Sequence, residues 1–90
     1  LSNNLISVYP NPIDLSNNNL NIIYDLYLGE IYLEIFDLKG KSISKTSFLT
    51  SYYGRQYLDY NPYLDVPSGI YFLKISNNSQ VDFVKLINIK

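Results

Sequence analysis

One stretch of this chain, Leu64–Ile75, constrains its fold more than any other. It contains a rigid turn, Pro67-Ser68-Gly69, because proline presets its own φ and glycine allows a backbone angle that other residues resist. In the residues that follow, an apolar set alternates with a set that includes a lysine, and successive side chains of a β-strand point to opposite faces. The inward set is Tyr71, Leu73 and Ile75, and the outward set is Ile70, Phe72 and Lys74. The sequence therefore predicts a strand whose start is set locally, with Tyr71 in the core.

The rest of the chain repeats this design of short alternating runs between turn residues. We expect further strands over Leu5–Tyr9, Leu20–Leu26, Glu30–Phe36, Ser42–Leu49, Arg55–Tyr60 and Val81–Lys90. Turns between them are indicated by Pro10-Asn11-Pro12, Asp37–Lys41 and Asn77-Asn78-Ser79. No segment has a helical period, and the chain contains no alanine. About seven short strands favour an all-β fold, an antiparallel sandwich of the immunoglobulin kind, over a closed barrel.

Three of these strands differ in how far we expect their two faces to be exposed to solvent. Glu30–Phe36 has apolar residues on one face and glutamates on the other, which is typical of an antiparallel strand with one solvated face. Ser42–Leu49 is more polar and is expected at a sheet edge. Val81–Lys90 has apolar residues on both faces, so we expect it to be covered on both sides. One face holds Val81, Phe83, Ile87 and Ile89, and the other holds Val84 and Leu86.

The composition excludes several classes of function. The 90 residues, 47% apolar and 17% charged, predict a single folded domain over residues 1–90, with 1–4 as a linker remnant. A net charge of −1 and scattered basic residues give no attraction for nucleic acid or an anionic membrane. The longest apolar run is too short to cross a membrane, so we expect no direct membrane insertion. We also expect the domain to be a monomer. A start at Leu1 indicates a piece of a longer protein.

The residue types that most often carry catalysis are missing. Without Cys or His there is no thiolate nucleophile, no disulfide framework and no imidazole base. Glu30 and Glu34 could act as a carboxylate pair, but we interpret them as part of a solvated face. Asp14, Asp37 and Asp65 could assemble a calcium site, although turn formation is the preferred interpretation because no calcium-loop spacing is present. We therefore expect no enzyme, no cofactor and no metal.

A group of tyrosines leaves one binding function open. Tyr52, Tyr53, Tyr57, Tyr60 and Tyr63 lie close together in the sequence, and such rings could stack a sugar or a peptide. Packing along a strand edge is the preferred interpretation. The competing function is an immunoglobulin-like accessory module of a surface protein that binds carbohydrate or mediates adhesion.

Four stretches, in order, resemble the C-terminal sorting domains of the type IX secretion system (type A, the Por secretion system family). Val8-Tyr9-Pro10-Asn11-Pro12 is similar to the V-Y-P-N-P opening of that family. Ile35–Lys41 resembles its central I-Y-D-x-x-G-K hairpin, with Phe36 in place of the usual tyrosine, and Leu64–Ile75 resembles its L-x-S-G-x-Y signature with two extra residues. Lys85–Lys90 is similar to the closing K-[LI]-[IV]-x-[IVL]-K strand. Each motif alone is a common turn or strand, and the four together are fairly specific.

The resemblance implies a non-catalytic secretion signal that directs a covalently linked N-terminal cargo across the outer membrane. Its expected partners are the type IX translocon and a sortase-like peptidase at the outer membrane, which in many members removes the domain and attaches the cargo to the cell surface. The expected location is the periplasm in transit, and afterwards the cell surface or the extracellular space. Such an address is read by a receptor and is not itself an anchor.

The resemblance also indicates which residues to examine. The motif residues are Pro10, Asn11, Pro12, Gly40, Lys41, Gly69, Tyr71, Lys85, Leu86, Ile87, Ile89 and Lys90. We expect two surfaces: Pro10-Asn11-Pro12 sets the entry of the chain and the spacing to the cargo, and Gly69, Tyr71 and Lys85–Lys90 form the recognised end. One hypothesis is that Lys85–Lys90 pairs edge to edge with a receptor strand, because main-chain ladders give affinity without charge.

Overall fold

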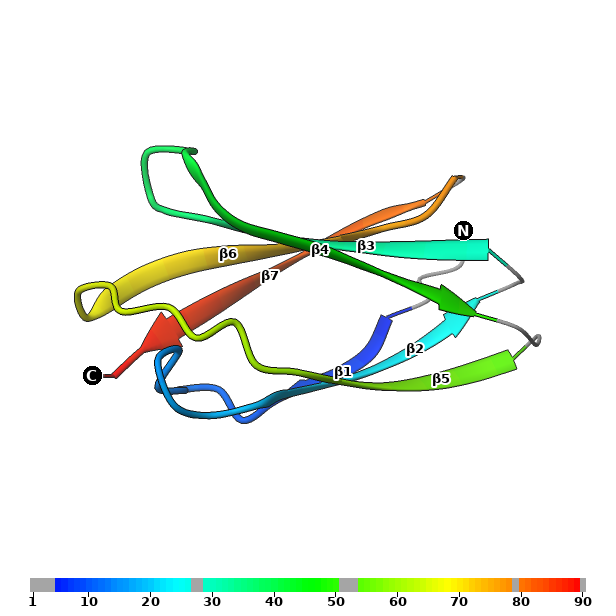
Figure 1. Cartoon of the computed structure of the whole chain (residues 1–90), viewed down its shortest axis with the longest axis horizontal. Helices are drawn as coiled ribbons and strands as arrows, with labels where there is room; N and C mark the ends of the chain where they lie inside the picture. Colours follow the sequence, from blue (N-terminus) through cyan, green and yellow to red (C-terminus); the bar gives the residue numbers. More distant parts are fainter. Residues whose placement is uncertain (1–4, 27–28, 51–53, 79, 90) are drawn as a thin grey trace.

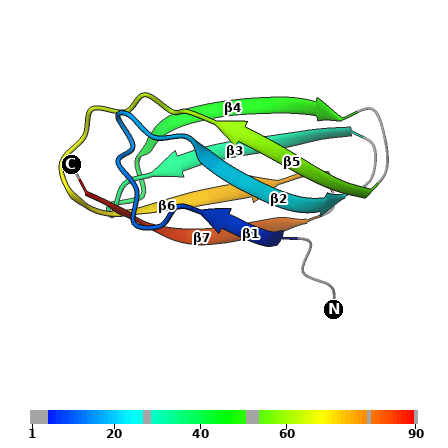
Figure 2. The same ribbon diagram turned by 90° about the horizontal axis from the view of Figure 1, so that it is seen from below.

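Seven strands form two antiparallel sheets that pack face to face (Figure 1). The computed structural model describes residues 5–26, 29–50, 54–78 and 80–89. The strands are β1 (Leu5–Tyr9), β2 (Leu20–Leu26), β3 (Gly29–Phe36), β4 (Ser42–Thr50), β5 (Gly54–Tyr60), β6 (Gly69–Ser76) and β7 (Val81–Asn88). One sheet has the order β1-β2-β5 and the other the order β4-β3-β6-β7 (Figure 2). The predicted immunoglobulin-like sandwich is confirmed.

The core lies between the sheets and follows the alternation of the strands. In β6, Tyr71, Leu73 and Ile75 are buried, as predicted. The other fully buried apolar residues are Ile13, Leu15, Leu20, Ile22, Tyr24, Ile31, Leu33, Ile35 and Leu86. The side chain of Leu26, expected on the same face as Tyr24, lies outside what the structure describes. Period-two patterning thus places the inward residues of β2, β3 and β6 correctly, because each of these strands has one buried face.

One side of the sandwich is closed by the edge strands β4 and β5. β4 pairs only with β3 among the described strands, so its predicted edge position is confirmed. The Phe48 ring meets the Tyr60 ring edge to face, with centroids 6.4 Å apart. The hydroxyls of Ser44 and Tyr60 form a hydrogen bond across the same gap. Tyr60 therefore joins the two sheets with both its ring and its hydroxyl.

The prediction that the last strand is covered on both sides is wrong. β7 pairs with β6 in a register that sets Leu86 opposite the buried Tyr71, and this turns the even-numbered residues of β7 inward. Its odd-numbered residues consequently lie on the outer face of the sheet and are exposed to solvent. The exposed apolar residues of this segment are Val81, Phe83, Ile87 and Ile89. The apolar pattern alone could not decide which face the second sheet would cover.

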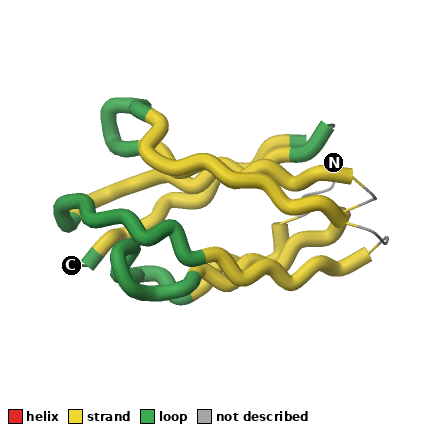
Figure 3. The backbone as a smooth tube through the Cα atoms, in the orientation of Figure 1, coloured by secondary structure: helices red, strands yellow, loops and turns green. Residues whose placement is uncertain are grey.

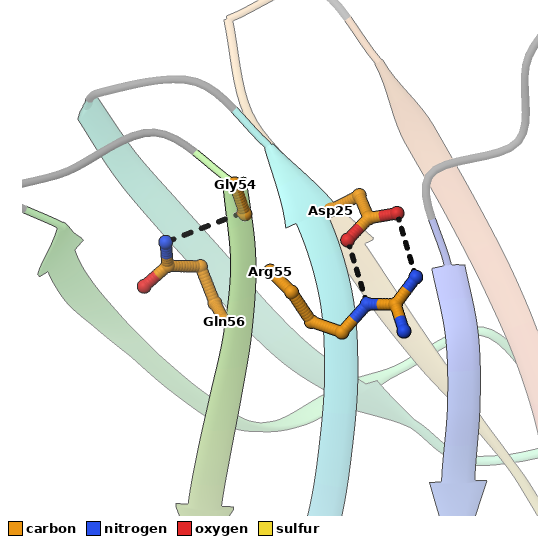
Figure 4. Close-up of polar contacts among 4 residues, drawn as sticks. All are labelled: Asp25, Gly54, Arg55 and Gln56. Atoms are coloured by element: carbon orange, nitrogen blue, oxygen red, sulfur yellow. Dashed lines mark hydrogen bonds and ion pairs between the residues drawn. The ribbon is translucent and has the colours of Figure 1, made fainter.

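The outer face of the three-stranded sheet is polar where β2 and β5 pair. Asp25 lies opposite Arg55 in the register, and the Arg55 Nε–Asp25 Oδ1 distance is 3.0 Å (Figure 4). The hydrogen bond from Arg55 holds the pKa of the Asp25 carboxyl below its ordinary value. Both side chains are about half exposed, so the ion pair contributes little to stability.

The loops are divided between two ends of the sandwich. The connections β1–β2, β3–β4 and β5–β6 lie at the same end as the last described residues (Figure 3). Within the described residues, no helix is long and apolar enough to span a membrane.

Candidate recognition surface

The segment after β1 runs beside β7 and hydrogen-bonds to its outer edge. The Asn11 side chain accepts a hydrogen bond from the Ile87 N–H at 3.0 Å and donates one to the Lys85 carbonyl at 2.7 Å. Two residues further on, the backbone of Ile13 donates to the Ile87 carbonyl at 2.9 Å and accepts from the Ile89 N–H at 2.8 Å. This contact is a short parallel bridge between Ile13 and Asn88.

The residue types around Asn11 explain this arrangement. Pro10 and Pro12 have no N–H, so their backbones cannot donate to a β-ladder. The amide of Asn11 carries one acceptor and one donor group, like a peptide unit, and it takes the place of the missing backbone partner. The edge of β7 from Lys85 to Ile89 is thereby already paired within the chain. Covering an edge in this way protects it from pairing with other strands.

Asn88, the last residue of β7, is a buried polar side chain that joins three segments. Only 2% of it is exposed. Its Oδ1 accepts from the Leu15 N–H at 2.9 Å, and its Nδ2 donates to the carbonyls of Val66 and Pro67, both at 3.1 Å. The buried amide of Asn88 thus has hydrogen-bond partners for both its oxygen and its nitrogen. Our sequence reasoning missed this residue, and the available signal was a polar residue at an inward position of a strand.

The turn before β6 is tied into the same network. Tyr71 is buried, as predicted, and its hydroxyl donates to the Pro67 carbonyl at 2.7 Å. Pro67 therefore accepts from both Tyr71 and Asn88. Gly69 has a φ of 150°, a region that other residues rarely adopt. The predicted turn is thus held by its own glycine and by two side chains from β6 and β7.

The β3–β4 hairpin lies next to this turn. Asp37 closes the loop, because its carboxylate accepts the N–H groups of Lys39 and Lys41 at 2.9 Å each. Gly40 adopts a φ of 89°, as the predicted left-handed position requires. Leu38 and the residues Ser68–Tyr71 line an open depression of about 300 Å³ between the hairpin and the start of β6. The hairpin and the β6 turn are therefore neighbours in space.

The structure brings Pro10-Asn11-Pro12, the Asp37–Lys41 hairpin, the Pro67-Ser68-Gly69 turn and the end of β7 to one end of the sandwich (the left end in Figure 1). The segments expected to form two separate surfaces lie together, because Asn11 bonds directly to the backbone of β7. Leu86 points into the core, whereas Lys85, Ile87 and Ile89 are exposed. Lys90, and the expected linker at 1–4, lie outside the described residues.

The tyrosine group does not form a single stacking platform among the residues that the structure describes. Tyr57 and Tyr63 are exposed, but Tyr60 is buried between the sheets. Tyr52 and Tyr53 lie outside the described residues.

The acidic candidates have local structural roles. Asp14 accepts the N–H and the hydroxyl of Ser16, as a turn-forming aspartate does. Glu30 accepts hydrogen bonds from the hydroxyls of Tyr32 and Ser47 on the solvated face. Within the described part of the chain, no three His, Cys, Asp or Glu side chains gather where they could hold a metal ion.

Comparisons with known proteins agree with the motifs. The family model described as the secretion system C-terminal sorting domain matches residues 7–90. A search of curated proteins and a search of solved structures each gave no match. The family model covers nearly the whole sandwich, including the Asn11 contact, the central hairpin, the β6 turn and the last strand. The chain belongs to the family of type IX secretion system C-terminal sorting domains, whose role is that of a C-terminal secretion signal.

Proposed function

We propose that this domain is a non-catalytic address that carries an N-terminally linked cargo through the type IX translocon to the cell surface. The observation that carries the proposal is the convergence of all four family motifs at one end of the sandwich. Hydrogen bonds of Asn11, Asn88 and Tyr71 hold three of these motifs together, and the central hairpin lies beside the β6 turn. A receptor can therefore read them as one rigid surface, which lowers the ordering cost of binding.

After transit, a sortase-like peptidase at the outer membrane removes the domain and attaches the cargo to the cell surface. The fold supports this sequence of events, because a compact domain behind a cleavage site can be discarded without disturbing the cargo. The domain itself contributes recognition and no chemistry, in keeping with a family that is non-catalytic in general.

A reporter fusion tests the proposal. A signal peptide, a fluorescent protein and residues 1–90 are joined and expressed in a bacterium that has the type IX system. We expect fluorescence at the cell surface or in the medium, and reporter retained in the periplasm of a strain without the translocon. Surface reporter that has lost this chain would support the removal step. Periplasmic retention in both strains would refute the proposal.

Asn11→Ala is an informative variant of the same fusion, because it removes both hydrogen bonds to β7 while leaving the core intact. We expect export to fall. Asn78→Ala is the matched control, since Asn78 is an exposed asparagine in the β6–β7 hairpin at the opposite end of the sandwich. Equal export of the two variants would show that the Asn11 contact does not shape the recognised surface.

A further inference from the structure

The outer face of the four-stranded sheet is unusually apolar along β7. Phe83 is 63% exposed and Ile87 is 40% exposed, and Val81 and Ile89 continue the row on either side. An outward strand face normally carries polar residues when it meets only water. Single exposed apolar residues need no explanation, but four of them along one strand face, with only Lys85 between them, indicate a surface that another molecule covers.

Two lysines lie among these apolar residues, Lys85 on β7 and Lys74 on β6. In the register, Phe83 lies opposite Lys74, and Lys85 lies opposite Phe72. Ile87 lies opposite Ile70, which is also exposed. The outer face of β6 and β7 thus carries apolar side chains with two cationic side chains, those of Lys74 and Lys85, between them.

A shallow groove extends this surface toward the central hairpin. Its volume is about 460 Å³, and its apolar lining comes from Phe36, Leu38, Phe72 and Phe83. Lys39 and Asp37 lie at the hairpin side of the groove, where the Asp37 carboxylate accepts the backbone N–H groups of Lys39 and Lys41. Apolar walls beside a cation suit a ligand that has both apolar and acidic groups.

The charges of the chain are divided unevenly between its two sheets. Most of its basic residues belong to the four-stranded sheet and its hairpin: Lys39, Lys41, Lys45, Lys74 and Lys85. The same sheet and hairpin hold four carboxylates, those of Glu30, Glu34, Asp37 and Asp82, and Glu34 of β3 lies opposite both Lys45 and Lys74 in the register. On the outward positions of β6 and β7 themselves, the charged residues are Lys74 and Lys85. Among the described residues, none of these lysines makes an ion pair with another side chain. In a chain of net charge −1, the outer face of β6 and β7 therefore carries positive charge.

A partner cannot form backbone hydrogen bonds with the edge of β7 between Lys85 and Ile89, because the groups at that edge are already bonded within the chain. Asn11 and Ile13 already occupy the edge groups of Lys85, Ile87 and Ile89. A partner that reads this end of β7 without displacing them must contact its side-chain face.

Charge decides which partner fits the face. A second copy of the chain would set lysines against lysines, which is unfavourable. An extended protein segment presents side chains at the same two-residue spacing as β7, so its apolar groups can meet Phe83 and Ile87 while its carboxylates meet the lysines. The apolar contacts would provide most of the affinity, and the carboxylates would fix how the bound segment is aligned along β7.

We propose that the outer face of β6 and β7 binds an extended protein segment in which apolar and acidic residues alternate. As a step in export, this inference rests on the proposed function and names the chemistry of the receptor segment. As a binding property of the domain, it can be tested without export.

A displayed library of random peptides, each as long as β7, is the probe. We expect the domain to enrich peptides that alternate apolar residues with Asp or Glu, and their binding to weaken with added salt. Phe83→Ser should weaken the binding of the enriched peptides about tenfold or more, because a buried aromatic contact is lost. The double variant Lys74→Glu with Lys85→Glu should remove the preference for acidic peptides.

Tyr57→Ser is the matched control, since Tyr57 is a similarly exposed aromatic residue on the outer face of the other sheet. It should bind the enriched peptides as the unchanged domain does. Circular dichroism melting of each variant shows whether the fold is kept, which we expect because all four substituted side chains lie on outer faces.

Four results would overturn the inference. Two of them are a library that enriches no acidic peptides, and equal binding by the Phe83→Ser and Tyr57→Ser variants. Binding to phosphatidylglycerol vesicles in place of peptides would assign the face to a lipid surface, and self-association in sedimentation velocity would assign it to a second copy. The reporter fusion separates the two proposals. Normal export of the Phe83→Ser fusion refutes this surface alone, whereas no export of the unchanged fusion refutes the proposed function.

Discussion

The Oδ1 atom of Asn11 accepts a hydrogen bond from the backbone N–H of Ile87, 3.0 Å away, across 76 positions of sequence. A single side chain thus links the first motif of the chain to the last. The companion bond to the Lys85 carbonyl makes the contact two-point, so Asn11 occupies the edge of β7 as a peptide unit would. The first prediction tests this link directly.

Asn11→Ala should destabilise the domain by about 1–2 kcal/mol, because two hydrogen bonds at a solvent-accessible edge are lost and their backbone partners turn to water. Urea denaturation measures the change. Hydrogen exchange at the Ile87 amide should become faster, since its N–H loses its acceptor. Asn78→Ala should change neither quantity, and slow exchange at Ile87 in the Asn11→Ala variant would contradict the assignment.

Asn88→Ala should cost about 2–4 kcal/mol, more than Asn11→Ala. Its side chain is buried, and its removal leaves the Leu15 N–H and the carbonyls of Val66 and Pro67 without this partner. Thermal melting checks the loss. Asn19→Ala, a change at an exposed asparagine of the β1–β2 connection, serves as the control and should stay within about 0.5 kcal/mol of the original stability.

Tyr71 separates folding from recognition. Tyr71→Ala should lower the free energy of unfolding by about 3–5 kcal/mol, which is comparable to the total stability of a small domain. An export defect in this variant would therefore report unfolding. Tyr71→Phe keeps the ring and loses only the bond to Pro67, at a cost of about 1 kcal/mol. We expect the Tyr71→Phe reporter fusion to be exported. Failed export of a folded Tyr71→Phe domain would mean that the hydroxyl has a role beyond the fold.

The raised pKa of the buried Tyr24 hydroxyl predicts how the stability of the domain changes at alkaline pH. Burial, together with the nearby Asp82 carboxylate, raises the pKa of Tyr24 from 10.0 to about 12. The folded state therefore holds this proton more tightly than the unfolded chain does. Stability from this source is fully present below pH 10 and is lost as the pH rises toward 12. Urea denaturation across this range should show a decline that Tyr24→Phe reduces, and equal slopes for the two proteins would contradict the assignment.

The ion pair on the outer face of the three-stranded sheet makes a contrasting prediction. Asp25→Asn should leave the midpoint of urea denaturation almost unchanged, because Asp25 and Arg55 are both about half exposed. Denaturation in low and high salt checks this. A midpoint that falls clearly at both salt concentrations would show that the pair is far less solvated than its exposure indicates.

Much of the fold could be predicted because it depends on local rules. The alternation in Glu30–Phe36 and in Ile70–Ile75 sorts inward from outward residues, and the turns at Gly40 and Gly69 need backbone angles that glycine adopts readily. A polar strand such as Ser42–Thr50 is recognisable as an edge. The family motifs follow the same rules, so they are in large part folding signals.

The arrangement of the recognition surface could not be predicted in this way. Pro10-Asn11-Pro12 is readable as a break in the chain, but nothing local indicates that Asn11 pairs with β7. Asn88 is one polar residue in an apolar strand until Leu15 and Pro67 are placed beside it.

The strands, their turns and most of the core follow from the order of the residues alone, because they depend on the side-chain alternation of single segments. The exposure of Phe83 and Ile87 on β7 depends on how the two sheets pack, since packing sets which side of β7 the second sheet covers. Asn11 likewise meets Ile87 only in the tertiary structure, because contacts between the two ends of a chain depend on how the whole sandwich closes.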